Sequence, residues 1–302
     1  MNRSCPRASV CSTIAIMCAP VSSNRPEQSR SSLEQLKRLK ARTNWAMAED
    51  RSKFMPKCYS LIKSWVGPPP NFQHIFHNAE MNFLLMECVT HESRSWNYLK
   101  RKKTLGFVIG SGYKDERELK VGEDGKPILR RCTAILWAAP QSFYNKVAVM
   151  RELFKIYDKF DVNYHYELNT HFHTACAWGC DDAVQKFLEA GQDPNCFMPK
   201  VDILPLNLAV KEDRRKVTEL LLKNGADPNK ADAQGLTPLH FICQRDKDDD
   251  LIELFFKICD DEELQVDVNA KDKANKTPLQ YVDVRCMTRV AEVLLRRGAF
   301  VL

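Results

Sequence analysis

The sequence predicts an all-α protein built as a solenoid of stacked two-helix units, and three observations support this prediction. The string Thr-Pro-Leu-His at 237–240 recurs as Thr-Pro-Leu-Gln at 277–280, and in degraded form three times upstream. A second string, Gly-Ala-Asp-Pro-Asn at 225–229, recurs as Gly-Gln-Asp-Pro-Asn at 191–195. Between the two strings, apolar residues recur at offsets of three and four. A long repeat period with helical spacing inside it is typical of stacked helical repeats.

The first string marks the start of the first helix in each unit. Threonine is a favourable N-cap because its hydroxyl accepts a hydrogen bond from a free backbone N–H of the first turn, and proline fits the first helical position. The sequence therefore predicts five units whose first helices start near 133, 170, 204, 237 and 277. Two units depart from the pattern, since Leu204 replaces the capping threonine and the first unit lacks the proline.

The second helix of each unit is predicted from an apolar stripe along one helix face. The stripes are Val149/Leu153/Phe154, Val184/Phe187/Leu188, Val217/Leu220/Leu221, Ile252/Phe255/Phe256 and Val290/Val293/Leu294. A single unit cannot bury such a face alone, so each unit has to stack on its neighbour.

With these strings in register, residues 127–302 resemble the ankyrin-repeat family. The resemblance implies paired antiparallel helices stacked side by side, with hairpin loops that project to one side. Unit spacings of 37 and 40 residues imply insertions, which we expect at 246–250 and 260–265. The chain also resembles uncharacterised insect ankyrin proteins, through its front part and the lead-in strings at 113–115 and 124–127. That second resemblance implies no activity.

The residues before the repeats divide into three parts. Residues 1–31 carry arginine and serine with no acid before Glu27, which favours a disordered tail or a targeting segment. Residues 32–96 are expected to be a short, irregular, partly helical N-terminal region, and 97–126 an N-terminal half-repeat that caps the array. The apolar end at 294–302 fits a thin C-terminal cap, or a fragment of a longer repeat protein.

The composition is that of an ordinary globular protein. The 302 residues are 44% hydrophobic and 28% charged, and none of the 12 cysteines lies in a Cys-x-x-Cys pair. We therefore expect reduced thiols and a cytoplasmic location, with the nucleus as the alternative. The apolar runs are shorter than the ~20 residues of a membrane helix, so no membrane partner is expected.

The sequence favours a protein without enzymatic activity, cofactor or metal. It contains none of the common phosphate-binding, nucleophile-elbow or zinc-protease strings. The cluster of His165, His171, His173, Cys176 and Cys180 raises a zinc hypothesis. In the repeat register, however, His173 takes the histidine position that links neighbouring loops by hydrogen bonds, and Cys176 takes a small buried position. Packing explains these residues without a metal.

Positive charge is concentrated in the front of the chain. Of the net charge of +6, residues 1–126 contribute +9 and residues 127–302 contribute −3. One basic cluster lies at 37–42, and a continuous basic run follows at Lys100, Arg101, Lys102 and Lys103. The alternative function is therefore a nuclear, nucleic-acid-associated regulator, whose binding would depend steeply on salt.

The function that the resemblance implies is protein binding. In the ankyrin family, partners are held by the hairpin tips and by the exposed ends of the first helices. On this sequence, those positions are Trp178, Lys211, Glu212, Gln234, Gln244, Arg245, Lys273, Lys276 and Arg285. Trp178 is singled out because tryptophan and arginine dominate interface hot spots. We expect a monomeric, non-catalytic scaffold or adaptor that binds a protein partner on its concave surface.

Overall fold

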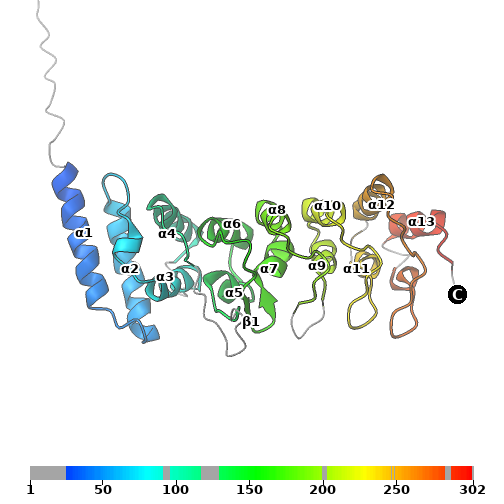
Figure 1. The fold of residues 1–302 in the computed structure, drawn as a ribbon, viewed down its shortest axis with the longest axis horizontal. Helices are drawn as coiled ribbons and strands as arrows, with labels where there is room; N and C mark the ends of the chain where they lie inside the picture. The colour runs from blue at the N-terminus through cyan, green and yellow to red at the C-terminus, as the bar shows by residue number, and fades with distance from the viewer. Residues whose placement is uncertain are drawn as a thin grey trace, which may run out of the picture.

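The chain forms an elongated row of helix pairs (Figure 1). The structure is a computed structural model that describes residues 25–90, 96–116, 129–198, 203–245, 247, 249–282 and 287–300. Strands within these residues are limited to one two-residue antiparallel hairpin, β1 (His165–Tyr166) with β2 (Asn169–Thr170), and an isolated bridge between Arg130 and His165. The expected all-α solenoid is confirmed.

The helices follow one another along the row in chain order. The front of the chain contains α1 (Arg25–Ala41), α2 (Ala48–Ser64), the 3-10 helix η1 (Phe72–His74), α3 (Asn78–Thr90) and α4 (Tyr98–Gly110). The repeats contain α5 (Ala134–Ala138), α6 (Lys146–Ile156), α7 (His171–Trp178), α8 (Asp181–Glu189), α9 (Pro205–Lys211), α10 (Arg215–Lys223), α11 (Pro238–Cys243), α12 (Leu251–Asp261), the 3-10 helix η2 (Pro278–Tyr281) and α13 (Thr288–Arg296).

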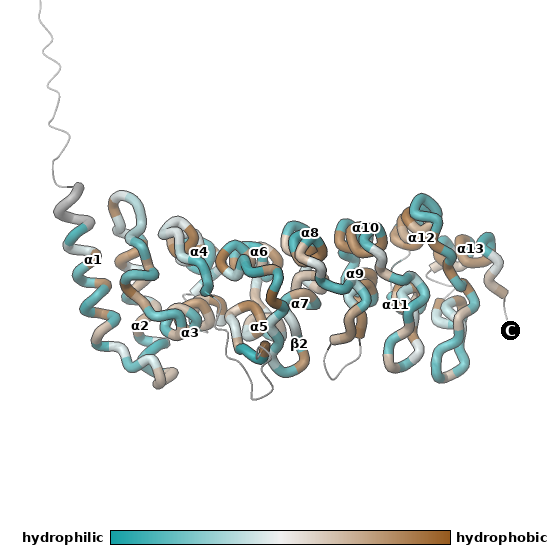
Figure 2. Tube along the Cα trace, viewed as in Figure 1, coloured by the Kyte–Doolittle hydropathy of each residue, from teal (hydrophilic) through white to brown (hydrophobic). Residues whose placement is uncertain are grey.

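These helices form two parallel rows (Figure 1). One row, here called the first-helix row, consists of α3, α5, α7, α9, α11 and η2. The other, the second-helix row, consists of α4, α6, α8, α10, α12 and α13. The hairpin loops project from the side of the first-helix row, and the two nearest the C-terminus are largely hydrophilic (Figure 2).

The first helix of each unit begins at the predicted position. Thr133 and Thr170 are the N-caps of α5 and α7, and each hydroxyl accepts a hydrogen bond from the backbone N–H three residues later. Leu204, Thr237 and Thr277 precede a proline in the first turn of α9, α11 and η2. Unit five differs, since its first helix is a 3-10 helix. It ends there because the β-branched residue at 282 adopts an extended backbone.

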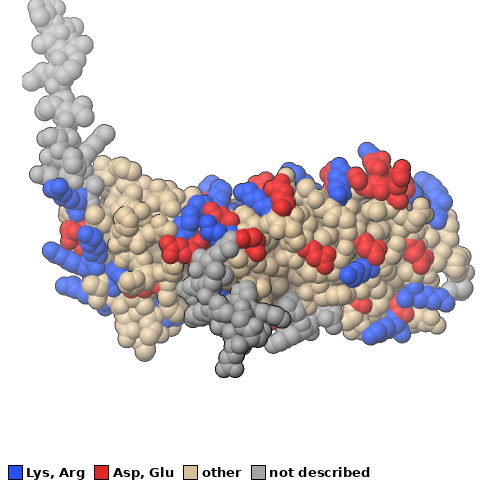
Figure 3. All heavy atoms as spheres, viewed as in Figure 1, with Lys and Arg blue, Asp and Glu red and all other residues tan. Residues whose placement is uncertain are grey.

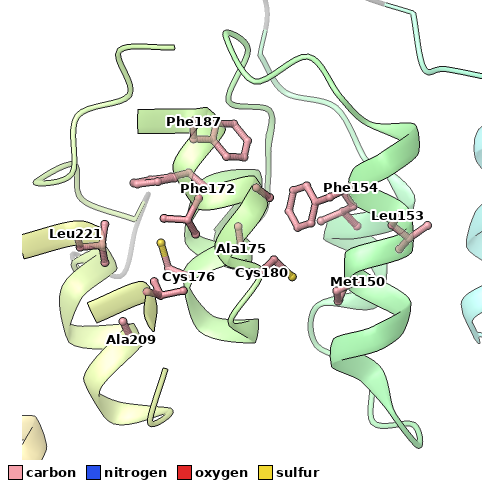
Figure 4. Packing of buried hydrophobic residues seen from close by; sticks show 14 of the residues in the cluster. Met150, Leu153, Phe154, Phe172, Ala175, Cys176, Cys180, Phe187, Ala209 and Leu221 are labelled. Carbon is pink, nitrogen blue, oxygen red and sulfur yellow. The ribbon is translucent and has the colours of Figure 1, made fainter. Parts of the chain in front are cut away.

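The predicted stripes of the second helices face the core. Val149, Leu153, Phe187 and Leu221 are buried. Phe187 of α8, for example, packs against the ring of Phe172 on α7 (Figure 4). Leu220 is a correction: it is only partly buried, and the next-but-one residue, Leu222, points inward instead. One continuous apolar cluster runs from α1 to the residues after α13, so the units share a core. A second, small cluster of Leu136, Val162 and Tyr164 lies beside it in unit one.

An asparagine ladder, made of Asn195, Asn229 and Asn269, links the loops of successive units. The side-chain amide of Asn229 donates to the carbonyl of Gln265 (2.6 Å), and its side-chain oxygen accepts from the backbone N–H of Asp267 (2.8 Å). Asn195 and Asn269 make the same pair of bonds to the loop that follows each of them. Each asparagine thus satisfies backbone groups that the next unit leaves open.

The front of the chain extends the same stack. Helix α3 packs on α5, and α4 packs on α6, so the two helices form one additional pair. The boundary expected between residues 96 and 97 therefore falls inside a helix pair. The first helix of this pair, α3, lies before the boundary, and the second, α4, lies in the predicted half-repeat after it. The expected tail at 1–31 is also partly corrected, since residues 25–31 belong to α1. Residues 1–24 lie outside the described residues.

A polar relay fixes this additional pair to unit one. The side chain of Asn82 on α3 donates to the carbonyl of Cys132 (2.8 Å) and accepts from the hydroxyl of Tyr157 (2.8 Å). That hydroxyl also accepts from the backbone N–H of Ala134 at the start of α5 (3.2 Å). These directional hydrogen bonds join three segments and so fix their relative positions, which apolar contact alone does not do.

Replacing Asn229 with alanine should destabilise the stack. The substitution removes two bonds between units, each of which contributes about 0.5–1.5 kcal/mol. Urea unfolding followed by circular dichroism measures this loss. Asn224→Ala is the matched control, because the Asn224 amide donates only to Leu220 within its own helix. Equal losses for the two variants would contradict a linking role for the ladder.

Candidate interaction surface

The hairpin tips are rigid and present their side chains to solvent. The carboxylate of Asp232 accepts from the backbone N–H groups of Gln234 (2.8 Å) and Leu236 (2.9 Å), which fixes the tip of unit four. The backbone N–H of Lys273 in the next tip donates to the carbonyl of Gln234 (3.0 Å). Between the tips lies Gly235, with φ +80°, where a Cβ would come within 2.9 Å of the Lys273 nitrogen. Only glycine fits this approach.

The side chains predicted at the tips are exposed. Those of Gln234 and Lys273 point into solvent, and that of Lys276 is exposed while its ammonium lies 5.3 Å from the ring centroid of Tyr281. All three side chains thus lie on hairpin tips whose backbone is fixed by hydrogen bonds.

The ends of the first helices carry further exposed side chains. Lys211 and Glu212, at the end of α9, and Gln244, at the end of α11, are exposed. Neither Lys211 nor Glu212 has an ion-pair partner among the residues that the structure describes. Lys211 and Glu212 are therefore available to a partner, whereas the side chain of Gln244 also forms a hydrogen bond with Tyr281.

Arg245 differs from the expectation that it presents its charge to a partner. Its side chain is only 8% exposed, and its guanidinium lies 3.2 Å from a carboxylate oxygen of Asp213 and 2.9 Å from one of Asp249. The same two carboxylates also face Arg215. Arg245 belongs to a network that joins units three and four, because its acidic partners come from both.

Trp178 is partly buried rather than free in solvent. Its ring covers the ammonium of Lys146, whose Nζ lies 3.8 Å from the ring centroid. The same ammonium donates to the carbonyls of Ala139 and Gln141 (2.5 Å each), just after α5. Burial lowers the pKa of Lys146 to about 8, whereas the ring and the two carbonyls favour its charged form. Trp178 thus joins unit two to unit one.

A second cation caps the neighbouring first helix in the same way. The Nε–H of Arg214 donates to the carbonyl of Ala177 (2.9 Å), near the end of α7. Its side chain lies so close to Gly179 (φ +65°) that a Cβ there would meet Arg214 Cδ at 2.9 Å. The cations opposite the negative ends of α5 and α7 are therefore structural.

The basic run is not one continuous patch. Lys102 and Lys103 are exposed, but Arg101 is buried, with its guanidinium 5.1 Å from the ring centroid of Phe143. The ammonium of Lys100 lies 5.5 Å from the ring centroid of Tyr59. These four residues lie on α4, where a continuous run necessarily points in all directions around the helix. The remaining predicted site residue, Arg285, lies outside the described residues.

Sequence reasoning missed two exposed aromatic residues near the end of α5. Trp137 is 38% exposed and Tyr144 is 79% exposed. The ring of Tyr144 lies 6.0 Å from that of Tyr98, edge to face. The repeat register contained no signal for an exposed Trp137, because the residues at the corresponding position in units two and four, Thr174 and Phe241, are buried. Exposed aromatic rings add to the candidate surface, since such residues are enriched at interfaces.

The histidines of the first string hold loops together. In unit four, the Nδ1 of His240 accepts from the backbone N–H of Thr237 (3.1 Å), and Nε2 donates to the carbonyl of Lys276 in the next tip (3.1 Å). In unit two, the Nδ1 of His173 lies 2.8 Å from the hydroxyl oxygen of Thr170, and its Nε2 lies 3.2 Å from the carbonyl oxygen of Cys196 in the next loop. This is the role that the repeat register assigns to His173.

The described residues offer no ready metal site or membrane helix. Among them, no group of three or more His, Cys, Asp or Glu side chains is placed to hold a metal ion. Burial raises the pKa of the Cys180 thiol to about 12, which disfavours the thiolate that metals bind. The described helices also include none with the length and apolar character to cross a bilayer.

Comparisons with known proteins point to one kind of repeat. A family model for ankyrin repeats, in three copies, matches residues 206–301. The palmitoyltransferase AKR1 of Kluyveromyces lactis is 32% identical over 127 residues, which are 42% of this chain and 16% of that enzyme. The ankyrin repeat protein OPG189 of variola virus is 29% identical over 113 residues, 37% of this chain and 19% of the viral protein.

A human relative gives a shorter match. The ARF GTPase-activating protein GIT1 is 31% identical over 78 residues, which are 26% of this chain and 10% of that protein. The chain thus spans less than a fifth of the length of each of these three relatives. Each match concerns a small part of the relative.

Trp178→Ala should destabilise the protein by about 1–2 kcal/mol, because it uncovers a buried cation. This expectation replaces the one from sequence, under which Trp178 serves a partner and not the fold. A double-mutant cycle with Lys146→Met, measured by urea unfolding, should give a coupling energy of similar size. Trp137→Ala is the control and should cost less, since Trp137 covers no buried ammonium within the described residues. A coupling near zero would show that the ring and the ammonium act independently.

The stability of the protein should fall as the pH drops from about 6.5 to 4. Burial lowers the pKa of His173 from 6.5 to about 4, so the unfolded chain binds this proton more tightly and protonation favours unfolding. Burial lowers the pKa of His171 further, to about 3, with the same sign. Each histidine contributes a slope of up to about 1.4 kcal/mol per pH unit in this window.

His173→Gln tests the contribution of one histidine. Glutamine keeps the capping arrangement that unit five uses, where the side-chain oxygen of Gln280 accepts from the backbone N–H of Thr277 (2.9 Å). Urea unfolding at pH 7.5, 6 and 5 should show a shallower loss for the variant than for the wild type. If stability falls with pH equally steeply in the variant and the wild type, then His173 has the same pKa in the folded and unfolded chain, which would contradict this prediction.

Proposed function

Because the chain is an ankyrin-repeat protein, we propose that it is a scaffold or adaptor that binds a protein partner and performs no chemistry of its own. Ankyrin repeats imply a role in protein–protein interaction. The proposed contact surface, here called the docking face, comprises the exposed ends of α9 and α11 and the hairpin tips of units four and five. Its residues are Lys211, Glu212, Gln234, Gln244, Lys273 and Lys276.

The observation that supports this proposal is that some polar residues form bonds between units, whereas others are exposed and unpaired. Lys146, Arg214 and Arg245 are engaged in helix caps and ion pairs between units. Lys211 and Glu212, which follow them along the same edge, are exposed and unpaired within the described residues. Side chains that do nothing for the fold are free to recognise a partner.

The stack suits this role because it is preorganised. The tips are joined by backbone bonds, and each asparagine of the ladder fixes the loop after it. A partner that docks on this face therefore causes little ordering of the chain, which keeps the entropic cost of association low.

We further propose a cytoplasmic location, in line with the thiol chemistry. Each cysteine in the described part of the chain is a free thiol, and six of them are buried. The alternative, a nucleic-acid-associated regulator, loses its main argument because Arg101 is buried and interrupts the basic run on α4.

Reversing charge on the docking face should abolish partner capture without unfolding the protein. The variant Lys211→Glu/Lys273→Glu is compared with the wild type by affinity purification and quantitative mass spectrometry. Lys257→Glu/Lys223→Glu is the matched control, because both lysines are exposed on the second-helix row. Proteins captured by the wild type should be lost from the first variant and retained by the control. Capture that is equal for both variants, at equal circular dichroism, would contradict the docking face.

A further inference from the structure

A groove lies between α1 and α2. These two helices stand at the front end of the stack, away from the docking face (Figure 1). Its volume is about 540 Å³. The two helices form an antiparallel hairpin in which α1 contributes little to the core, since Leu36 is its only fully buried apolar side chain among those described. The groove is therefore open along its length rather than filled by a neighbouring helix.

The walls of this groove are basic. Arg38 lies in the last turn of α1, and Arg42 lies just after the helix ends. Lys53 and Lys57 lie one turn apart on α2, and Asp50 is the acidic residue of the lining. All four cations are exposed. Arg38, Arg42 and Lys57 have no ion-pair partner among the described residues, whereas Lys53 lies 2.6 Å from Glu49.

Two other cations of α1 are already neutralised, unlike Arg38. The ammonium of Lys40 lies 2.9 Å from a carboxylate oxygen of Glu80, and that of Lys37 lies 3.2 Å from one of Glu34. Lys and Arg side chains gather over α1 at the left end of the molecule, where few acidic ones accompany them (Figure 3). The uncompensated charge is thus directed into the groove from both sides.

The floor of the groove is apolar. Leu39 from α1 and Leu61 from α2 are partly exposed in it, above the buried ring of Phe54. A phosphate backbone gains nothing from exposed leucine, and Phe54 offers no exposed ring on which a base could stack. An acidic peptide with apolar side chains matches both the walls and the floor.

We infer that this groove binds an acidic segment of a partner protein, one that carries leucine-like anchors between its carboxylates. The segment lies along the hairpin with its apolar side chains on Leu39 and Leu61 and its carboxylates facing Arg38, Arg42 and Lys57. Arginine favours carboxylates because its planar fork donates two parallel hydrogen bonds. The chain's own residues 1–26 contain no acidic residue, so charge excludes them as the occupant.

The test uses the full chain and a defined probe. The probe is a fluorescein-labelled peptide made of four Glu-Leu-Leu-Asp repeats, and binding is followed by fluorescence anisotropy. Arg38→Glu/Lys57→Glu should weaken binding at least tenfold, about 1.4 kcal/mol. Arg30→Glu/Lys63→Glu is the matched control, with the same charge change on the same two helices outside the groove. The affinity of this control for the peptide should stay within about twofold of the wild-type affinity, because salt screens charges that lie away from the groove.

Two comparison ligands and one structural readout decide between occupants. A peptide with serine in place of leucine should bind at least tenfold more weakly. A photo-crosslinkable probe on the wild-type chain should label α1 and α2, which tests the site even if a variant fails to fold. No binding to the wild type, equal binding of the serine peptide, tighter binding of a 14-nucleotide single-stranded DNA, or dimerisation of the chain in place of peptide binding would each overturn the inference.

Discussion

Contact between neighbouring units is the interaction on which the whole structure depends. Each unit contributes two short helices, and α5 and η2 are too short to persist alone in water. Their buried apolar residues mostly join one cluster that spans the stack, so the units share a core. The N-terminal helices obey the same rule, because α3 and α4 take the two positions of a unit and pack on α5 and α6.

Polar side chains give this apolar stack its register. Asn82, Asn195 and Asn229 each bond to a different segment from their own, and His173 and His240 reach the next loop. Such bonds are directional, whereas apolar contacts tolerate sliding. They also divide the polar surface into two classes. Side chains that bond across units are unavailable to partners, and those that do not, such as Lys211, remain free.

Much of the fold was predictable from sequence because the repeat strings carry their own physical cause. Threonine followed by proline starts a helix by local chemistry, so the starts at Thr237 and Thr277 needed no tertiary information. The phase of a stripe was less secure. Leu220 and Leu222 are close neighbours in sequence, and only the packing of α10 decides which of them points inward. The pairing of α3 with α4 was not predicted, because no repeat string of the Thr-Pro-Leu-His kind marks the start of α3.

The candidate site was predictable in position but not in role. Trp178 and Arg245 lie at the end of first helices, as expected, yet both hold units together. The ring of Trp178 contacts Lys146, and Arg245 contacts Asp213, and both partners lie in the preceding unit, far away in sequence. A local sequence pattern therefore cannot predict such contacts. The groove between α1 and α2 was hidden for the same reason, since its walls belong to two helices.

Hydrogen exchange along the full chain tests the central claim most directly, because protection reports the free energy that opens each segment. If neighbours stabilise one another throughout, protection should be highest in α7 and α9, in the middle of the stack, and decline gradually toward α1 and α13. Helices α3 and α4 should be protected together with α5 and α6. A sharp step between residues 116 and 129, with uniform protection on each side, would show two independent domains and contradict a single stack.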